Sequence, residues 1–203
     1  MRAISKRNLI FLLLGLDPDG SICEGIGGIT RLQKYLFLLN EEEHVPPSGQ
    51  GFEFKAYKAG PYSSKLYDDL EFLENLGYIE NEITATAMSA EISEMEDVCF
   101  DDLMGDGADI VDGELFDGFG SSDAHDEHRF ILTQKGKAKV EELLANTEYK
   151  PVVDSVRRIK AKFDTDSLFD LLYYVYTKYP DMTVESEIKE EVLNRVRDRR
   201  SRA

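Results

Sequence analysis

The residues best suited to chemistry follow a Gly60-Pro61 turn, at the start of a helix expected over residues 62–76. They are Tyr62, Ser63, Ser64 and Lys65. Hydroxyl and ammonium groups at such a position can donate hydrogen bonds to phosphate oxygens and to base edges in the major groove of DNA. The same helix continues with four acids, Asp68, Asp69, Glu71 and Glu74. Acids facing phosphate are unfavourable, so only the first turn of the helix is expected to contact DNA.

Other cations could add contacts to phosphate. Four of them lie in the first third of the chain, namely Arg31, Lys34, Lys55 and Lys58. The C-terminal end carries Arg195, Arg197, Arg199, Arg200 and Arg202, with Asp198 as the only acid among them. A basic arm commonly binds nucleic acid or an acidic surface, and we predict Arg197, Arg199 and Arg200 as nucleic-acid contacts. The alternative is a solvated helix end, where Arg is also favoured by the helix dipole.

The excess negative charge of the chain is concentrated in one segment. No Lys or Arg occurs between Lys65 and Arg129, and residues 80–128 contain 16 Asp and Glu. The remainder carries 40 − 16 = 24 acids against 24 bases, so it is balanced. Balance outside the segment argues against general adaptation to high salt. The pattern predicts an acidic insert over residues 83–127, of a composition that favours disorder and could fold onto a basic partner or compete with DNA for the Arg-rich tail.

Metal-binding and catalytic patterns are weak. His125 and His128 stand among acids, but the acid spacing does not match a calcium-binding loop, and we expect a solvated loop. The run Gly25-Ile-Gly-Gly28 lacks the Lys-Ser/Thr of a phosphate-binding loop. Cys23 and Cys99 have neither metal-ligand spacing nor a convincing His partner. The sequence therefore predicts no enzyme, no metal site and no cofactor.

A series of short elements must position the polar residues. Helices are expected at 5–16, 29–39, 62–76, 134–144, 151–163, 167–178 and 184–200, and strands at 52–57, from 78 and at 129–132. Ser5 and Thr133 are suitable helix N-caps, and Pro61 suits a helix start. The order resembles a winged helix, although the short strand of that fold more often precedes the second helix. The third helix would read DNA, and the hairpin interrupted by the acidic insert would be the wing.

The fold class expected is thus mainly α with a small β component, a winged helix-turn-helix with a long acidic insert in its wing and helices after it. We predict a winged-helix domain over residues 1–147 and a C-terminal helical segment over 148–203 that forms a homodimer. Phe169, Leu172, Tyr173 and Tyr176 keep helical spacing within that segment, which is typical of core or dimer packing.

Several motifs resemble the YwgA-like group of uncharacterised prokaryotic proteins and, more distantly, the Panacea domains found as antitoxins. They are Gly28-Ile-Thr-Arg-Leu-Gln-Lys-Tyr-Leu-Phe-Leu-Leu39, Phe54 to Tyr57, Gly60-Pro-Tyr-Ser-Ser-Lys-Leu-Tyr67 and Leu76-Gly-Tyr-Ile79. The later Leu132-Thr-Gln-Lys-Gly136 is similar to the exit from a wing into a helix in winged-helix regulators. The resemblance covers residues 5–80 and 129–145 and implies the fold, whereas the insert departs from it.

Two functions follow from these patterns. The first is a winged-helix DNA-binding protein, a transcriptional regulator of double-stranded DNA. The alternative is a non-enzymatic interaction module, antitoxin-like or defence-associated, whose acidic insert binds a basic protein. The apolar run after Arg2, Lys6 and Arg7 is too short for export and no cleavage site follows, so we expect a cytoplasmic protein without a membrane span.

Overall fold

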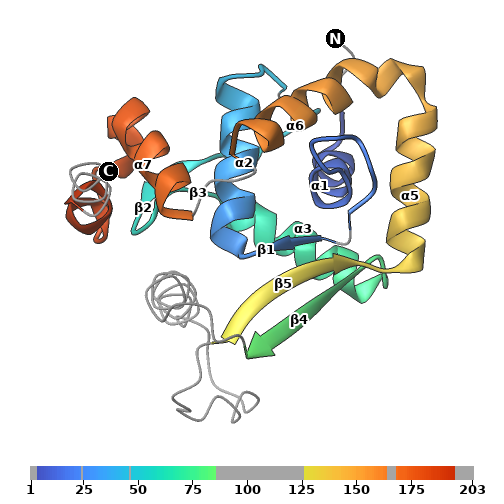
Figure 1. Ribbon diagram of the computed structural model, residues 1–203, viewed down its shortest axis with the longest axis horizontal. Coiled ribbons are helices and arrows are strands. Elements are labelled where there is room, and N and C mark those ends of the chain that lie inside the picture. The colour runs from blue at the N-terminus through green and yellow to red at the C-terminus, as the bar shows by residue number, and fades with distance from the viewer. Residues whose placement is uncertain (1–3, 24, 46, 86–125, 164–167, 195–203) are drawn as a thin grey trace.

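The computed structural model describes the chain except for residues 1–3, 24, 46, 86–125, 164–167 and 195–203. The described part is mostly helical with a small β component, as the sequence predicts. Figure 1 shows helices placed around one central helix, with a small sheet along one side. The acidic insert predicted at 83–127 lies outside the described residues apart from its two ends.

The central helix is α1 (Lys6–Gly15), which Figure 1 shows end-on. Its predicted cap is confirmed, because the Ser5 Oγ accepts a hydrogen bond from the Asn8 N–H at 3.1 Å. Every residue from Leu9 to Gly15 is buried, since α2 (Ile29–Glu41), α5 (Gln134–Ala145) and α6 (Lys150–Phe163) all pack against α1. An apolar run without a polar face predicts this surrounded position.

The sheet combines one very short strand with a long hairpin. Its strands are β1 (Gly25–Gly27), β4 (Ile79–Ala85) and β5 (Asp126–Leu132), in the order β1-β5-β4, with both pairs antiparallel. The β4–β5 pair confirms the predicted hairpin. β1 stands before the second helix and escapes the sequence pattern, because three residues are too few to show alternation. A Cβ on Gly25 would lie 2.0 Å from the Phe130 carbonyl oxygen, so this pairing requires glycine.

A second, two-stranded hairpin precedes the third helix. β2 (Lys55–Tyr57) pairs with β3 (Gly60–Tyr62), and α3 (Ser64–Asn75) follows. The strand predicted at 52–57 is therefore shorter than expected. The prediction that Pro61 begins the helix is wrong, because Pro61 lies opposite Ala56 in the hairpin. Gly60 has a φ of 87°, a conformation that glycine adopts without strain, and it turns the chain into β3.

The C-terminal helices complete the core. α5 begins at the predicted cap, where the Thr133 Oγ1 accepts a hydrogen bond from the Gly136 N–H at 3.2 Å. Two 3-10 turns, η1 (Thr147–Tyr149) and η2 (Pro180–Thr183), flank α6 and α7 (Leu168–Lys178). The last helix predicted from residue 184 is helical only from 189 to 194 among the described residues.

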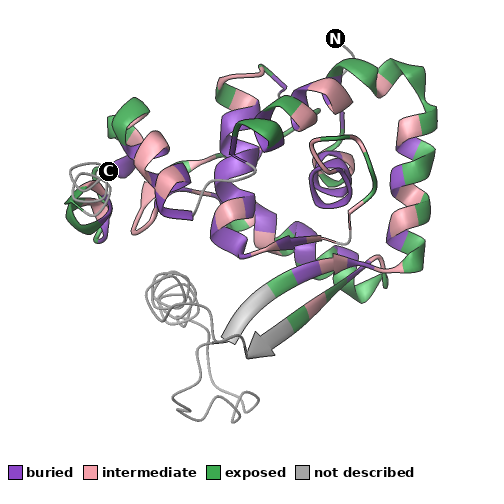
Figure 2. Cartoon of the chain, viewed as in Figure 1, coloured by how far each residue is buried: buried purple, intermediate pink, exposed green. Residues whose placement is uncertain are grey.

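The predicted boundary after residue 147 does not separate two cores. α6 and α7 both pack on α2, and the buried residues of α1, α2 and α7 belong to one hydrophobic cluster. Figure 2 colours the buried parts of these helices purple. Phe169 and Tyr176 are buried in this common core. Packing within the chain therefore accounts for the aromatic stripe of α7, and dimerisation through it stays a prediction.

Candidate functional site

Two of the predicted DNA contacts are buried inside the protein. Lys34 is 2% exposed and its Nζ donates a hydrogen bond to the Pro61 carbonyl oxygen at 3.0 Å. Ser63 is 1% exposed; its N–H donates to the Gln33 Oε1 at 2.8 Å, and its Oγ donates to the Phe52 carbonyl oxygen. These bonds join α2 to the start of α3. The prediction that Lys34 and Ser63 contact DNA is therefore wrong in this structure.

Two more predicted contacts are paired with acids. The Lys65 Nζ forms an ion pair with Glu53 and donates to the Gln50 Oε1 at 3.4 Å. A hydrogen bond from Lys65 lowers the pKa of Glu53 below its ordinary value. The Lys58 Nζ lies 4.0 Å from the Glu187 Oε1. These lysines are consequently less available to an incoming phosphate than the sequence alone suggests.

The remaining predicted contacts are scattered. Lys55 and Ser64 are exposed, while Tyr62 is half-buried and its ring lies 4.9 Å from that of Tyr57. Arg31 lies in α2 and donates to the Tyr35 hydroxyl at 3.3 Å, whereas Lys55 lies in β2. Arg197, Arg199 and Arg200 lie outside the described residues. Of the predicted cations in the described part of the chain, Lys34 is buried and Lys58 and Lys65 lie beside acids, so these three offer little charge to DNA.

The exposed side of α3 differs in character from its first turn. Its exposed residues are Ser64, Asp68, Glu71, Phe72, Glu74 and Asn75, and the exposed Leu76 follows. Phe72 and Leu76 are large apolar side chains with 40% and 45% of their surface exposed. We call Asp68, Glu71, Phe72, Glu74 and Leu76 the α3 face. It combines three carboxylates with two apolar side chains, and the neighbouring strand β4 adds the exposed Glu80 and Glu82.

Asp69 does not share this face, although the sequence alone gives no reason to separate it from Asp68, Glu71 and Glu74. It is 4% exposed, and its carboxylate lies 3.0 Å from the Lys6 Nζ and 2.9 Å from the Arg7 Nε. The Arg7 guanidinium also stacks on the Phe72 ring, 3.6 Å from its centroid. Asp69 is therefore a structural residue that fixes α1 against α3.

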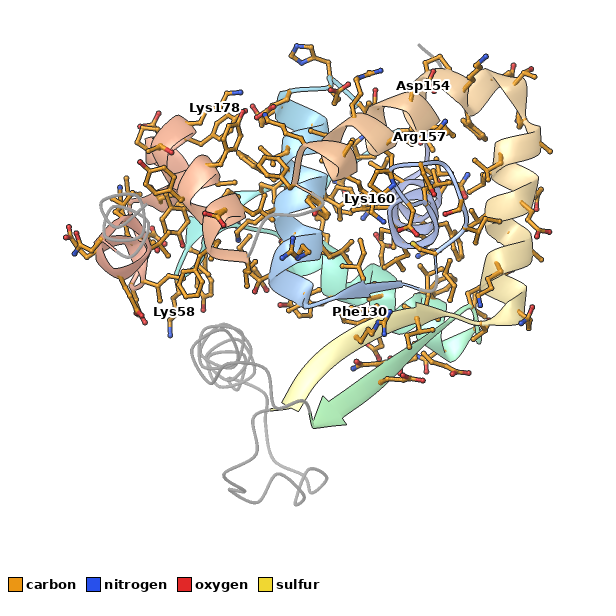
Figure 3. All side chains as sticks on the ribbon, in the orientation of Figure 1. Lys58, Phe130, Asp154, Arg157, Lys160 and Lys178 are labelled. Carbon is orange, nitrogen blue, oxygen red and sulfur yellow. The ribbon has the colours of Figure 1, made fainter. Side chains whose placement is uncertain are left out.

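A carboxylate at the end of α2 organises a network that the sequence reading misses. The Glu42 carboxylate accepts hydrogen bonds from Lys162 and Lys178 Nζ, each at 2.9 Å, and from the Tyr174 hydroxyl at 2.8 Å. Burial opposes ionisation of Glu42, but these donors outweigh it and lower its pKa to about 2. Hydrogen bonds to Tyr174 and Glu42 raise the pKa of Lys178, which Figure 3 labels on α7. The network ties α6 and α7 to α2.

A second buried lysine closes the end of α1. Lys160 is 7% exposed and lies between α6 and α1 (Figure 3), where its Nζ donates to the carbonyl oxygens of Leu13, at 3.3 Å, and of Leu16. Its Nζ lies 3.6 Å from the Cys23 Sγ. Burial raises the pKa of the Cys23 thiol, although Lys160 acts in the opposite direction. A protonated thiol is a poor nucleophile, and the Lys160 contacts satisfy two carbonyl oxygens at the C-terminal end of α1.

One small pocket opens between α2, the β2–β3 hairpin and α3. It is lined by Thr30, Gln33, Lys34, Tyr57, Lys58, Ala59, Gly60, Tyr62 and Tyr67, and its cavity is about 20 Å³. We call it the hairpin pocket. The Tyr62 ring lies 4.9 Å from the Tyr57 ring and 5.9 Å from the Tyr67 ring, so aromatic side chains form much of its wall.

Within the described residues, no three His, Cys, Asp or Glu side chains gather in a way that could hold a metal ion. None of the helices described is long and apolar enough to cross a membrane. Compared with models of protein families, with curated proteins and with solved structures, the chain matches none. The α3 face and the hairpin pocket are the two candidate sites considered among the described residues.

Proposed function

We propose that the chain is a winged-helix protein that binds a basic protein partner through the α3 face. The order α1, β1, α2, α3, β4, β5, with the β2–β3 hairpin between α2 and α3, and the sheet order β1-β5-β4 support the winged-helix assignment. So does the resemblance of its motifs to the YwgA-like group. In this fold α3 occupies the position of the DNA-reading helix, and the β4–β5 hairpin is the wing.

The observation that carries the proposal is the composition of the α3 face. Asp68, Glu71 and Glu74 are exposed there and would approach phosphates if α3 lay in a groove. Binding to DNA draws its strength from cations that replace condensed counterions, so three carboxylates at that surface oppose it. The exposed Phe72 and Leu76 supply the apolar contacts on which protein interfaces depend.

The chemistry of the face also specifies the partner. An apolar pair bordered by carboxylates is complementary to a segment that presents apolar side chains flanked by Lys or Arg, as an amphipathic basic helix does. The acidic insert predicted from the sequence would extend the same negative potential along the wing. A basic antitoxin- or defence-associated partner fits this description.

Fluorescence anisotropy with a labelled amphipathic Lys/Leu peptide of 18 residues tests the proposal. The variant Asp68→Asn/Glu71→Gln/Glu74→Gln removes the charge of the face, and Glu141→Gln/Glu185→Gln/Glu190→Gln makes the same change at exposed positions elsewhere. We expect the first variant to weaken binding about tenfold or more and the second less than about threefold, since distant exposed charges are screened. Equal losses in the two variants would contradict the proposal.

A DNA-binding transcriptional regulator is the second candidate, favoured by the position of α3, by the exposed Ser64 at its start and by the exposed Lys55 in β2. A labelled 30-base-pair duplex, titrated across a salt series, tests it. The intact chain is compared with one in which residues 83–127 are replaced by a short turn. Binding that weakens with salt and strengthens on deletion of the insert would favour this candidate over the partner-binding one.

A further inference from the structure

One arginine of the chain already lies against the α3 face. The Arg7 guanidinium, from α1, stacks on the Phe72 ring at 3.6 Å from its centroid, and the Arg7 Nε lies 2.9 Å from the Asp69 Oδ1. A guanidinium is planar, so its face can cover an aromatic ring while its edge donates to a carboxylate. Phe72 and a carboxylate of the same helix therefore hold an arginine within the folded protein.

The Phe72 ring has a second side that is open to solvent. Phe72 keeps 40% of its surface exposed although Arg7 lies against it. The Arg7 guanidinium covers one face of the ring, so the exposed surface belongs to the other face and to the ring edge. Within the part of the chain that the structure describes, no second cation or ring stacks on Phe72.

Acids border the exposed side of the ring. Asp68 precedes Phe72 by four positions and Glu71 follows Asp68 by three, and side chains at these separations are neighbours on the surface of a helix. Both acids are exposed, and among the described residues neither forms an ion pair, whereas Asp69 is paired with Lys6 and Arg7. An exposed ring and an unpaired carboxylate thus repeat, on the outside of α3, the two groups that hold Arg7.

We propose that the α3 face recognises an arginine of its protein partner, which stacks on the exposed side of the Phe72 ring and pairs with Asp68. This inference rests on the proposed function, because it names the basic side chain that the face binds. A lysine fits less well. Its ammonium is a compact and strongly hydrated charge without the plane that lets a guanidinium stack on a ring and pair with a carboxylate together.

Fluorescence anisotropy at one ionic strength compares the Lys/Leu peptide of the preceding test with a peptide in which every Lys is replaced by Arg. We expect the intact chain to bind the Arg/Leu peptide about fivefold more tightly, the size of effect that a cation–π contact at an exposed site provides. Phe72→Leu keeps an apolar side chain without the ring, and should reduce this preference to less than about twofold. Leu76→Ala, on the same face, should weaken both peptides alike and leave the preference unchanged.

Asp68→Asn tests the carboxylate. We expect it to reduce the preference for Arg to less than about twofold, because a guanidinium gains more than an ammonium from a facing carboxylate. Glu74→Gln makes the same change of charge two positions after Phe72, on another side of the helix, and should leave the preference unchanged. If Phe72→Leu does not fold, Asp68→Asn and Glu74→Gln decide the question.

The outcomes separate this inference from the proposed function. Equal affinity of the intact chain for the two peptides, or a preference that survives Phe72→Leu or Asp68→Asn, would overturn the arginine assignment and leave partner binding by the α3 face standing. Binding of neither peptide would contradict the proposed function, and the assignment with it.

The Arg-rich tail of the chain is the other occupant to test. Arg197→Gln/Arg199→Gln/Arg200→Gln in the full chain should change affinity for the Arg/Leu peptide less than about threefold. A larger gain would mean that the tail itself competes for the face as a tethered ligand, and would overturn the assignment to a separate partner.

Discussion

Two poorly exposed charges on α2, at Glu42 and Lys34, are held in opposite ways. At the C-terminal end, the Glu42 side chain is 14% exposed and accepts hydrogen bonds from two lysines and a tyrosine. In the N-terminal half, Lys34 is 2% exposed, donates to the carbonyl oxygen of Pro61 and borders a cavity that no acid lines. The Glu42 carboxylate is met by opposite charges, whereas the Lys34 ammonium donates to a carbonyl oxygen.

Glu42 is held by several donors from two other helices, whereas Lys34 donates to a carbonyl oxygen of the hairpin. A carboxylate at the C-terminal end of a helix opposes the helix dipole, so Glu42 needs the cations of α6 and α7 to remain ionised there. Its network consequently stabilises the attachment of both helices. Lys34 donates to the carbonyl oxygen of Pro61, so its contact attaches the β2–β3 hairpin to α2.

The largest expected effect follows from breaking the Glu42 network. Glu42→Gln removes the negative charge and replaces one carboxylate oxygen by an NH2 donor, so Lys162, Lys178 and Tyr174 keep only a neutral amide oxygen as acceptor. We expect the free energy of unfolding to fall by about 2 kcal/mol, less than for a fully buried pair because both lysines are partly solvated. Urea unfolding at pH 7 measures it. The adjacent, exposed Glu41→Gln is the control, and a loss there of similar size would contradict this interpretation.

The same network predicts a dependence of stability on pH. The pKa of Glu42 is about 2 in the folded protein, below its ordinary value of 4.5. A lowered pKa means that the stabilisation is complete above pH 4.5 and is lost as pH falls toward 2. We expect this loss, about 2 kcal/mol after allowance for solvent screening, in the intact chain. Urea midpoints measured from pH 6 to pH 2.5 should fall less steeply in Glu42→Gln, and parallel curves would refute the assignment.

A smaller effect compares two neighbouring serines at the start of α3. Ser63 is buried and donates to the Phe52 carbonyl oxygen, whereas Ser64 is exposed. Ser63→Ala should lower the free energy of unfolding by about 1 kcal/mol because it leaves that carbonyl oxygen without a donor, and Ser64→Ala should change it by less than about 0.5 kcal/mol. Thermal unfolding of the two variants distinguishes a structural serine from a surface one.

Much of the fold could be predicted because its signals are local. Ser5 and Thr133 cap their helices, and the bond that each accepts comes from a residue three positions on. The apolar run in α1 and the regular spacing in α2 likewise needed no knowledge of distant contacts. The strand β1 was missed because it exists only through its pairing with β5, more than a hundred residues later.

The candidate site was less predictable, since burial of a polar residue depends on distant segments. Lys34 is covered by a hairpin whose Pro61 lies 27 residues later, and Glu42 meets Lys162 and Lys178 from 120 and 136 residues away. Lysine and glutamate are seldom buried, so residue type suggested exposure for both. The exposure of Phe72 and Leu76 was equally hard to predict. Phe72 lies in α3 and Leu76 directly follows it, and the inward side of this helix is also apolar.

The smallest expected effect on the free energy of unfolding is at Lys34, the second charge in this comparison. Lys34→Met replaces a buried ammonium by an apolar side chain of similar length. The variant loses the hydrogen bond to Pro61 but no longer has to bury a charge, and replacements of this kind are often close to neutral. We expect the free energy of unfolding at pH 7 to change by less than about 1 kcal/mol, well below the loss for Glu42→Gln. A loss in urea unfolding as large as that of Glu42→Gln would mean that the Lys34 contact with Pro61 stabilises the fold as strongly as the Glu42 network does.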